Sequence, residues 1–201
     1  MGELGTSGEI ALWIGAAVVF LIVIVWMLLR KKAGPRIPDG LRPGRSLPDF
    51  TVADESGNPI RSVQVIGSPT VMLFVRGNWC PFCTSQVKDL TKYYKDIVDI
   101  GAKLILVTPK PLETTRRVAE FFEVEFDFWL DDRLEAARQL GLVMPAGVPG
   151  DHQKEYGDDT LWPTALVIDA AGIIRFAKLS RFVIDRPDPK VLLAELRKLQ
   201  K

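Results

Sequence analysis

The chain has 201 residues, 47% of them hydrophobic and 25% charged, a composition typical of a folded protein and not of a disordered one. With 26 basic and 25 acidic residues the formal net charge is +1, which argues against a nucleic-acid partner. Two cysteines and the single histidine, His152, exclude a disulfide-rich scaffold and a four-ligand structural zinc site. We therefore expect no bound cofactor and no metal, and a redox-active thiol pair is the chemistry that remains.

An uncharged apolar run, IALWIGAAVVFLIVIVWMLL at residues 10–29, follows an N-terminal tail at residues 1–9. At about 1.5 Å per residue it is long enough to cross a hydrocarbon core of about 30 Å, so it predicts one transmembrane helix in contact with membrane lipid. Acidic residues precede the run and the basic cluster 30–32 follows it, which does not fit a cleaved signal peptide. The positive-inside rule then predicts a single-pass protein with its C-terminal domain in the cytoplasm, and the periplasmic side is the alternative.

Residues 30–46 are rich in proline, glycine and basic residues, which predicts a linker that lies near anionic lipid headgroups. Residues 47–201 are enough for one domain. Their apolar patterns predict strands, helices and one further apolar run. The strands are expected at 50–53, 70–75, 103–108, 164–169 and 173–177. One helix is expected to begin near residue 81, and others are expected at 88–100, 112–122, 132–140 and 190–199. The short apolar run is at 126–130. Strands that alternate with helices and then end in a hairpin and a helix predict an α/β fold.

The two cysteines, Cys80 and Cys83, have the C-x-x-C spacing of a redox pair and follow the predicted strand 70–75. If that strand runs into a helix beginning near Pro81, Cys80 lies at the helix N-terminus, where unpaired amides and the helix dipole stabilise a thiolate. Arg76 adds positive charge if it points inward. Cys83 lies one turn further in, so we predict that Cys80 attacks and Cys83 resolves. The alternative is a pair of buried, unreactive cysteines.

Several segments together resemble the peroxiredoxin-like branch of the alkyl hydroperoxide reductase and thiol-specific antioxidant (AhpC/TSA) family. They are LPDF at 47–50, the turn at Gly57, the strand 71–75 with RGNWCPFC at 76–83, and residues 101–108 and 162–169. The resemblance spans about residues 47–199. It implies a thioredoxin-like fold, with a central mixed sheet flanked by helices, and a peroxidatic Cys80 with Cys83 as the resolving candidate.

The resemblance also implies that Pro163, which precedes Thr164 and a strand, is a cis-proline that faces the cysteine pair and aligns an incoming thiol or disulfide. An ordinary trans-proline at a strand start is the alternative. We expect Arg76, Trp79 and Pro81 to shape the other side of the site.

Two departures from the family pattern concern peroxide binding. The family places a threonine or serine three residues before the attacking cysteine, where this chain has Gly77, and a proline seven residues before it, where this chain has Leu73. The family also uses an arginine from a distant strand, for which Arg175 and Arg181 are candidates, although surface charge is the preferred explanation of both.

The loop at 143–160 lies next to Pro163 in the sequence, so it is expected either to cover the site and select partners or to be a tolerated insertion. His152 in this loop is a candidate proton shuttle, with plain solvation as the alternative.

The sequence therefore predicts a membrane-anchored thiol oxidoreductase whose Cys80 and Cys83 cycle between dithiol and disulfide, reducing peroxides or partner disulfides and drawing on a thiol reductant. A thioredoxin-like exchange protein without peroxidase activity is the alternative. A non-catalytic module that binds Cu(I) through the two thiolates is a weaker one, because His152 lies outside the final sheet.

Overall fold

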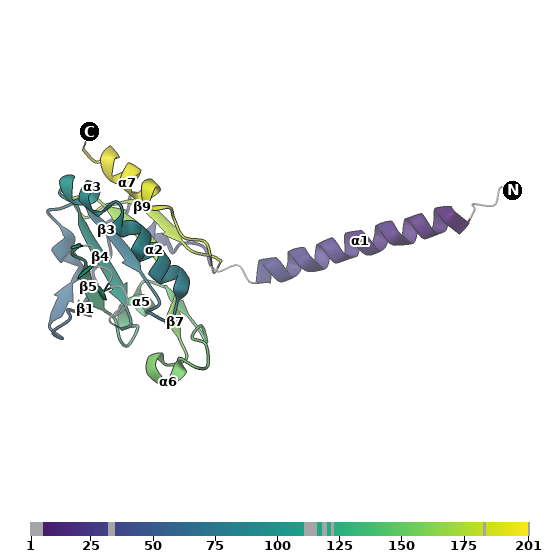
Figure 1. Ribbon diagram of the computed structural model, residues 1–201, viewed down its shortest axis with the longest axis horizontal. Coiled ribbons are helices and arrows are strands. Elements are labelled where there is room, and N and C mark those ends of the chain that lie inside the picture. Colours follow the sequence, from purple (N-terminus) through teal and green to yellow (C-terminus); the bar gives the residue numbers. More distant parts are fainter. Residues whose placement is uncertain are drawn as a thin grey trace. The chain divides into compact units, whose positions relative to one another are not determined.

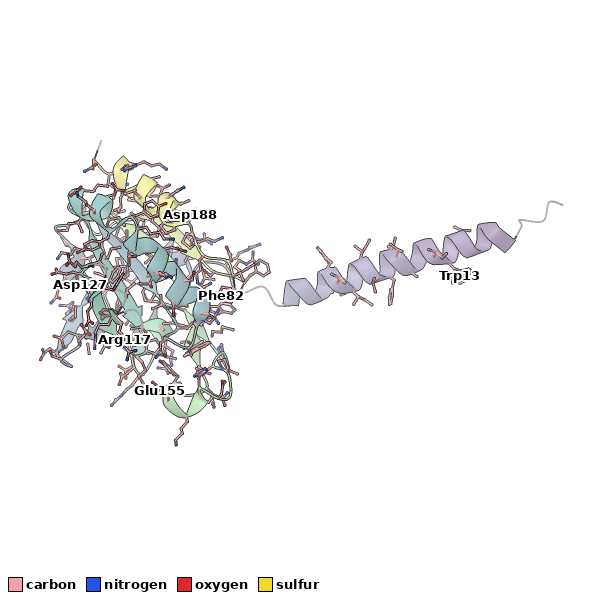
Figure 2. The ribbon with its side chains drawn as sticks, in the orientation of Figure 1. Trp13, Phe82, Arg117, Asp127, Glu155 and Asp188 are labelled. Atoms are coloured by element: carbon pink, nitrogen blue, oxygen red, sulfur yellow. The ribbon has the colours of Figure 1, made fainter. Side chains whose placement is uncertain are left out.

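The computed structural model describes residues 6–31, 35–110, 116–117, 120–121, 123–182 and 184–200. The chain divides into two compact units, Met1–Gly34 and Pro35–Lys201 (Figure 1). The first unit contains helix α1 (Thr6–Lys31), whose side chains at 12–27 are all exposed (Figure 2). Although the sequence predicts a membrane-spanning helix over 10–29, no helix in the described part of the chain is long and apolar enough to cross a membrane.

A seven-stranded mixed sheet forms the centre of the second unit, in the order β2-β1-β5-β4-β3-β8-β9. Its strands are β1 (Thr51–Ala53), β2 (Pro59–Arg61), β3 (Thr70–Phe74), β4 (Lys103–Thr108), β5 (Asp127–Leu130), β8 (Thr164–Ile168) and β9 (Ile174–Leu179). The central strand β3 is parallel to β4 and antiparallel to β8. A separate two-stranded sheet pairs β6 (Val143–Met144) with β7 (Thr160–Leu161).

Five α-helices and two 3₁₀ helices of the second unit have described bounds. They are α2 (Pro81–Thr91), α3 (Tyr94–Asp99), α5 (Glu135–Gln139), α6 (Gln153–Tyr156) and α7 (Pro189–Lys198), with η1 (Asp39–Leu41) and η2 (Ser62–Val65). Helix α7 contacts both α2 and α3, and it also contacts β8 and β9. Together α2, α3 and α7 cover one face of the sheet, and α2 carries Cys83.

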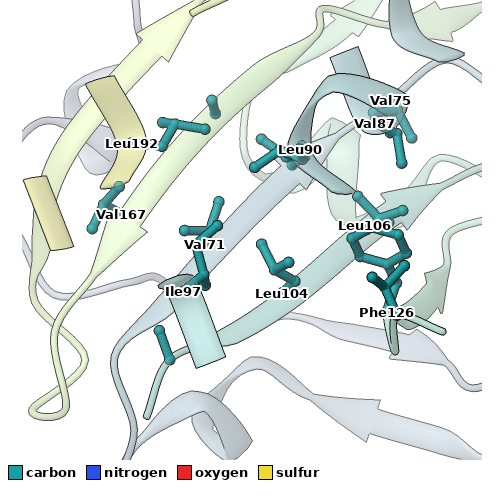
Figure 3. Close-up of a cluster of buried hydrophobic side chains, with 14 of the residues drawn as sticks. Val71, Val75, Val87, Leu90, Ile97, Leu104, Leu106, Phe126, Val167 and Leu192 are labelled. Atoms are coloured by element: carbon teal, nitrogen blue, oxygen red, sulfur yellow. The ribbon is translucent and has the colours of Figure 1, made fainter. Parts of the chain in front are cut away.

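Strand β3 is buried on both faces, which explains why it reads as a continuous apolar run instead of an alternating one. Because side chains alternate along a strand, Val71 and Leu73 join the core under α2, α3 and α7 (Figure 3). Met72 and Phe74 join a second core on the opposite face, together with residues of α5. Each fully buried side chain of this size contributes about 1.5–3 kcal/mol to folding, so the strand leading to Cys80 is firmly held.

The predicted hairpin and most predicted strands are present, with β4 at the expected residues 103–108. The expected helix at 88–100 is instead two helices, because the hydroxyl of Thr91 donates to the carbonyl of Lys88 at 2.7 Å and α2 ends there. The predicted helix at 112–122 lies largely outside the described residues.

Residues 35–46, predicted as part of a linker, lie within the second unit. Leu41 is completely buried, and Ser46 forms a β-bridge with Ile173 beside the β8–β9 hairpin. The segment therefore packs on the domain, because a buried leucine outweighs the flexible composition around it.

Candidate active site

The C-x-x-C segment lies where β3 passes into α2. Cys80 is the N-cap residue of α2, in an extended conformation, and Pro81 occupies the first turn as expected. The Sγ atom of Cys80 accepts a hydrogen bond from the backbone amide of Cys83 at 3.4 Å. The carbonyl of Cys80 accepts from the amides of Cys83 and Thr84 at 3.0 and 3.1 Å. The positive end of the helix therefore faces the sulfur of Cys80.

The two cysteines are free thiols with different acidities. A hydrogen bond from the Cys83 side chain lowers the pKa of Cys80 to about 6, aided by the Cys83 amide and by Arg76 and Arg186, and opposed by burial. The pKa of Cys83 is raised well above its ordinary value, because Cys83 donates to the Cys80 sulfur, is fully buried and lies beside the Cys80 charge. Cys80 is therefore the thiol that ionises first.

Two arginines from different parts of the chain converge on the pair. Nη2 of Arg186 lies 3.5 Å from Sγ of Cys83 and 3.9 Å from Sγ of Cys80. Arg76 points inward, with only 6% of its surface exposed and its Cζ atom 5.8 Å from the ring centroid of Trp79. The Nε atoms of both guanidinium groups are buried without a hydrogen-bond partner. The positive charges of both arginines lower the pKa of Cys80.

Arg186 was not among the arginines that the sequence suggested. Of those candidates, Arg175 instead forms an ion pair with Asp169 at 2.7 Å, and Arg181 is exposed. The only sequence sign of Arg186 is its position in Arg-Pro-Asp-Pro at 186–189, directly before α7. Such a rigid turn can fix an arginine against a neighbouring element.

The loop at 143–160 reaches back to the residues before Cys80. The ring of Trp79 is stacked on His152, with centroids 6.1 Å apart, and meets Tyr156 edge-on at 6.5 Å. The hydroxyl of Tyr156 donates to Oδ1 of Asn78. His152 therefore lies against Trp79, and its nearest charged partner is Asp151 at 3.6 Å.

Gly77 makes this contact possible. Its φ is +121°, a conformation that other residues rarely adopt, and a Cβ atom there would lie 2.7 Å from Cε1 of Tyr156. The position where the family carries a hydroxyl side chain is thus filled by the edge of a tyrosine ring from a distant loop.

Thr164 begins β8 and Pro163 directly precedes it, beside the point where the chain leaves β3, since Thr164 pairs with Phe74. The cis-proline prediction is wrong, because no peptide bond among the described residues is cis. Extended strands continue on both sides of Trp162 and Pro163, and the trans form is the lower in energy. The hydroxyl of Thr164 donates to the carbonyl of Trp162 at 3.0 Å, so it is turned to its own chain and not to the sulfurs.

A groove of about 320 Å³ adjoins Arg186 between the start of α2 and the segment before α7. Its lining includes Phe82, Gln86, Ile184, Pro187 and Pro189. Within the described ranges, no group of three or more His, Cys, Asp or Glu side chains is arranged to hold a metal ion. The chemistry present is that of an activated thiol beside a second thiol and two guanidinium groups.

Comparison with known proteins places this geometry in context. A model of the AhpC/TSA family matches residues 43–177. A chloroplastic peroxiredoxin Q of Sedum lineare is 23% identical over 99 residues, which are 49% of this chain and 53% of the relative. The chain thus spans about half the length of that curated relative.

Solved structures show the same fold. The structure of peroxidoxin BcpB of Mycobacterium tuberculosis superimposes with a TM-score of 0.63 at 21% identity, over 80% of this chain and 99% of the other. A protein of Chlorobium tepidum assigned as a thiol:disulfide interchange protein, DsbE, superimposes with a TM-score of 0.56 at 19% identity, over 80% and 99%. At these identities the likeness establishes a thioredoxin-like α/β fold.

Proposed function

The chain belongs to the AhpC/TSA family, and from this we propose that it is a thiol peroxidase in which Cys80 and Cys83 cycle between dithiol and disulfide. The observation that carries the proposal is the pairing of a Cys80 thiol, whose pKa is about 6, with a neutral Cys83 that donates to it. Arg186, which lies against both sulfurs, supports the same division of roles. A nucleophile that is mostly ionised at neutral pH and a resolving thiol one helical turn away are the two parts that the cycle requires.

In the first step the Cys80 thiolate attacks one oxygen of the peroxide, a sulfur–oxygen bond forms and the oxygen–oxygen bond breaks. The departing oxygen takes a proton and leaves as water or an alcohol, and Cys80 is oxidised to a sulfenic acid. Arg76 and Arg186 hold the thiolate before this attack. In the second step the sulfur of Cys83 attacks that of Cys80, the disulfide forms and water leaves. An external dithiol, which we propose to be a partner protein, then reduces the disulfide.

Thiol-disulfide exchange with a partner protein is a second candidate. Gly77 carries no hydroxyl to hold a peroxide, and Arg186 faces a groove that has apolar walls at Phe82 and Ile184. Exchange would use the same Cys80 thiolate to attack a disulfide, and it needs an open approach for another chain instead of a peroxide pocket.

Stopped-flow oxidation of the reduced full-length protein separates the two candidates. Hydrogen peroxide should oxidise Cys80 much faster than it oxidises a free cysteine at the same fraction of thiolate. If peroxide reacts no faster than free cysteine while a protein disulfide is reduced readily, the peroxidase proposal is wrong and exchange is the activity.

Two variants test the roles of the cysteines. Cys80→Ser should abolish both reactions, because serine at this position supplies no thiolate. Cys83→Ser should still react once and then retain a sulfenic acid or a mixed disulfide, detectable by mass spectrometry. Loss of the first reaction in Cys83→Ser would reverse the assignment.

A further inference from the structure

Helix α6 in the loop at 143–160 has no part in the proposed cycle, yet its Tyr156 is packed against the cysteine loop. The ring edge lies where a side chain of residue 77 would be, with Cε1 at 2.7 Å and the hydroxyl oxygen at 3.3 Å from an ideal Cβ position. A glycine at 77 is therefore required for this ring to pack. The contact joins two segments that are 79 positions apart in the sequence, and the three atoms nearest to that Cβ position all belong to Tyr156.

The polar end of Tyr156 is also fixed. Its hydroxyl donates to Oδ1 of Asn78, the residue between Gly77 and Trp79. Burial raises the pKa of Tyr156, so the phenol keeps its proton and acts as a donor through the neutral pH range. One side chain of α6 thus holds two consecutive residues of the loop that leads to Cys80.

The same loop fixes Trp79 from two sides, and Trp79 in turn bounds Arg76. His152 is stacked on the indole and Tyr156 meets it edge-on. The guanidinium of Arg76 lies over that indole at 5.8 Å, and its Nε atom has no hydrogen-bond partner. Packing against Trp79 therefore constrains where the charge of Arg76 sits.

We propose that Tyr156 is a positioning residue that, through Asn78 and Trp79, holds Arg76 against the Cys80 thiolate. The phenol of Tyr156 contacts Asn78 and the indole of Trp79, and that indole contacts the guanidinium of Arg76. The proposal rests on the proposed function only in taking Cys80 as the reactive thiol. It assigns the loop at 143–160 a role in setting thiolate reactivity.

The test is the ionisation of Cys80 in the reduced full-length protein, followed by the ultraviolet absorbance of the thiolate and by the pH dependence of alkylation with iodoacetamide. Tyr156→Phe keeps the ring and loses the hydroxyl, and should raise the pKa of Cys80 by about half a unit, an approximately threefold change in acidity. Tyr156→Ala also releases Trp79 and should raise it by about one unit, a tenfold change.

Asn78→Leu removes the acceptor and should match the shift of Tyr156→Phe. The double variant should shift no further, because the two residues share one bond. Tyr94→Phe is the matched control, since Tyr94 of α3 packs on Phe126 at 6.3 Å and should leave the pKa of Cys80 unchanged.

The proposal is overturned if Tyr156→Phe and Tyr156→Ala both fold and keep the wild-type pKa of Cys80, or if Tyr94→Phe shifts it equally. Should Tyr156→Ala fail to fold, Tyr156→Phe and Asn78→Leu decide the matter, and additive shifts in their double variant also contradict the shared bond. The readout needs no peroxide, so absence of peroxidase activity in the wild type would refute the proposed function and leave this test intact.

Discussion

Replacing Arg186 tests whether an arginine that is distant in sequence activates Cys80. Arg186→Gln keeps a polar, though shorter, side chain and removes its positive charge. Nη2 of Arg186 lies 3.9 Å from Sγ of Cys80, so the thiolate loses a cation at close range while the hydrogen bonds from Cys83 stay in place. The pKa of Cys80 should therefore rise, and it should not return to its ordinary value.

The size of the rise follows from the distance. At 3.9 Å, two unit charges interact by about 4 kcal/mol at an effective dielectric constant of about 20, and by about 1 kcal/mol in bulk water. These limits correspond to about three units and about one unit of pKa. The lower limit applies here, because Arg186 is partly exposed and because the hydrogen bond from the Cys83 side chain is the largest cause of the shift. We expect the pKa of Cys80 to move from about 6 to about 7.

Alkylation of the reduced protein with iodoacetamide measures this change. Near pH 6 about half of wild-type Cys80 is thiolate, whereas the variant would hold about a tenth, so its rate should fall about fivefold. Arg175→Gln is the matched control, since Arg175 is paired with Asp169. An unchanged pH profile in Arg186→Gln, or an equal shift in Arg175→Gln, would refute the reasoning.

Three further outcomes follow from the structure. Gly77→Ala should destabilise the protein by about 1–3 kcal/mol in urea unfolding, since its Cβ would meet Tyr156. Gly157→Ala, also at a positive φ but facing open space, should lose only the backbone part, about 1 kcal/mol. Asp131→Ala should cost about 1–2 kcal/mol in the same assay, because its buried carboxylate accepts from two amides of α5 at 3.1 and 2.8 Å. Because the pKa of Cys80 is lowered from 9.0 to about 6, its thiolate stabilises the folded reduced protein above pH 9, and this stabilisation is lost as the pH falls to about 6. The unfolding free energies of wild type and Cys80→Ser should therefore converge over that interval. A constant difference between them would contradict the lowered pKa.

Local pattern was sufficient to predict the elements that carry the two thiols. Thr70 to Phe74 is apolar because both faces of β3 are covered, and Pro81 begins the next helix because it needs no amide donor. The C-x-x-C spacing then places both sulfurs within one helical turn. These features depend on residues close together in the sequence, so the nucleophile could be placed without tertiary information.

The partners of the thiols could not be predicted in the same way. Arg186 lies 103 residues after Cys83 and reaches it only because α7 packs against α2. The turn Arg-Pro-Asp-Pro is the one local feature that distinguishes it from Arg175, which lies in β9, and from Arg181, which follows β9. Tyr156 was missed for a related reason, because its contact with Gly77 depends on how the loop at 143–160 folds back.

The roles of the two cysteines follow from the direction of their donors more than from proximity to positive charge. Arg186 lies closer to Cys83 than to Cys80, at 3.5 against 3.9 Å, so the arginine alone would favour ionisation of Cys83. The amide and the thiol of Cys83 both donate toward Cys80, which lies at the helix N-terminus with its sulfur facing the free amides. Ionising Cys83 instead would reverse a hydrogen bond and place the charge at the more deeply buried sulfur. In the cycle that we propose, the order of attack is thus set by the thiol and the amide of Cys83, which both donate to Cys80. The arginines raise the fraction of thiolate without choosing which sulfur carries it.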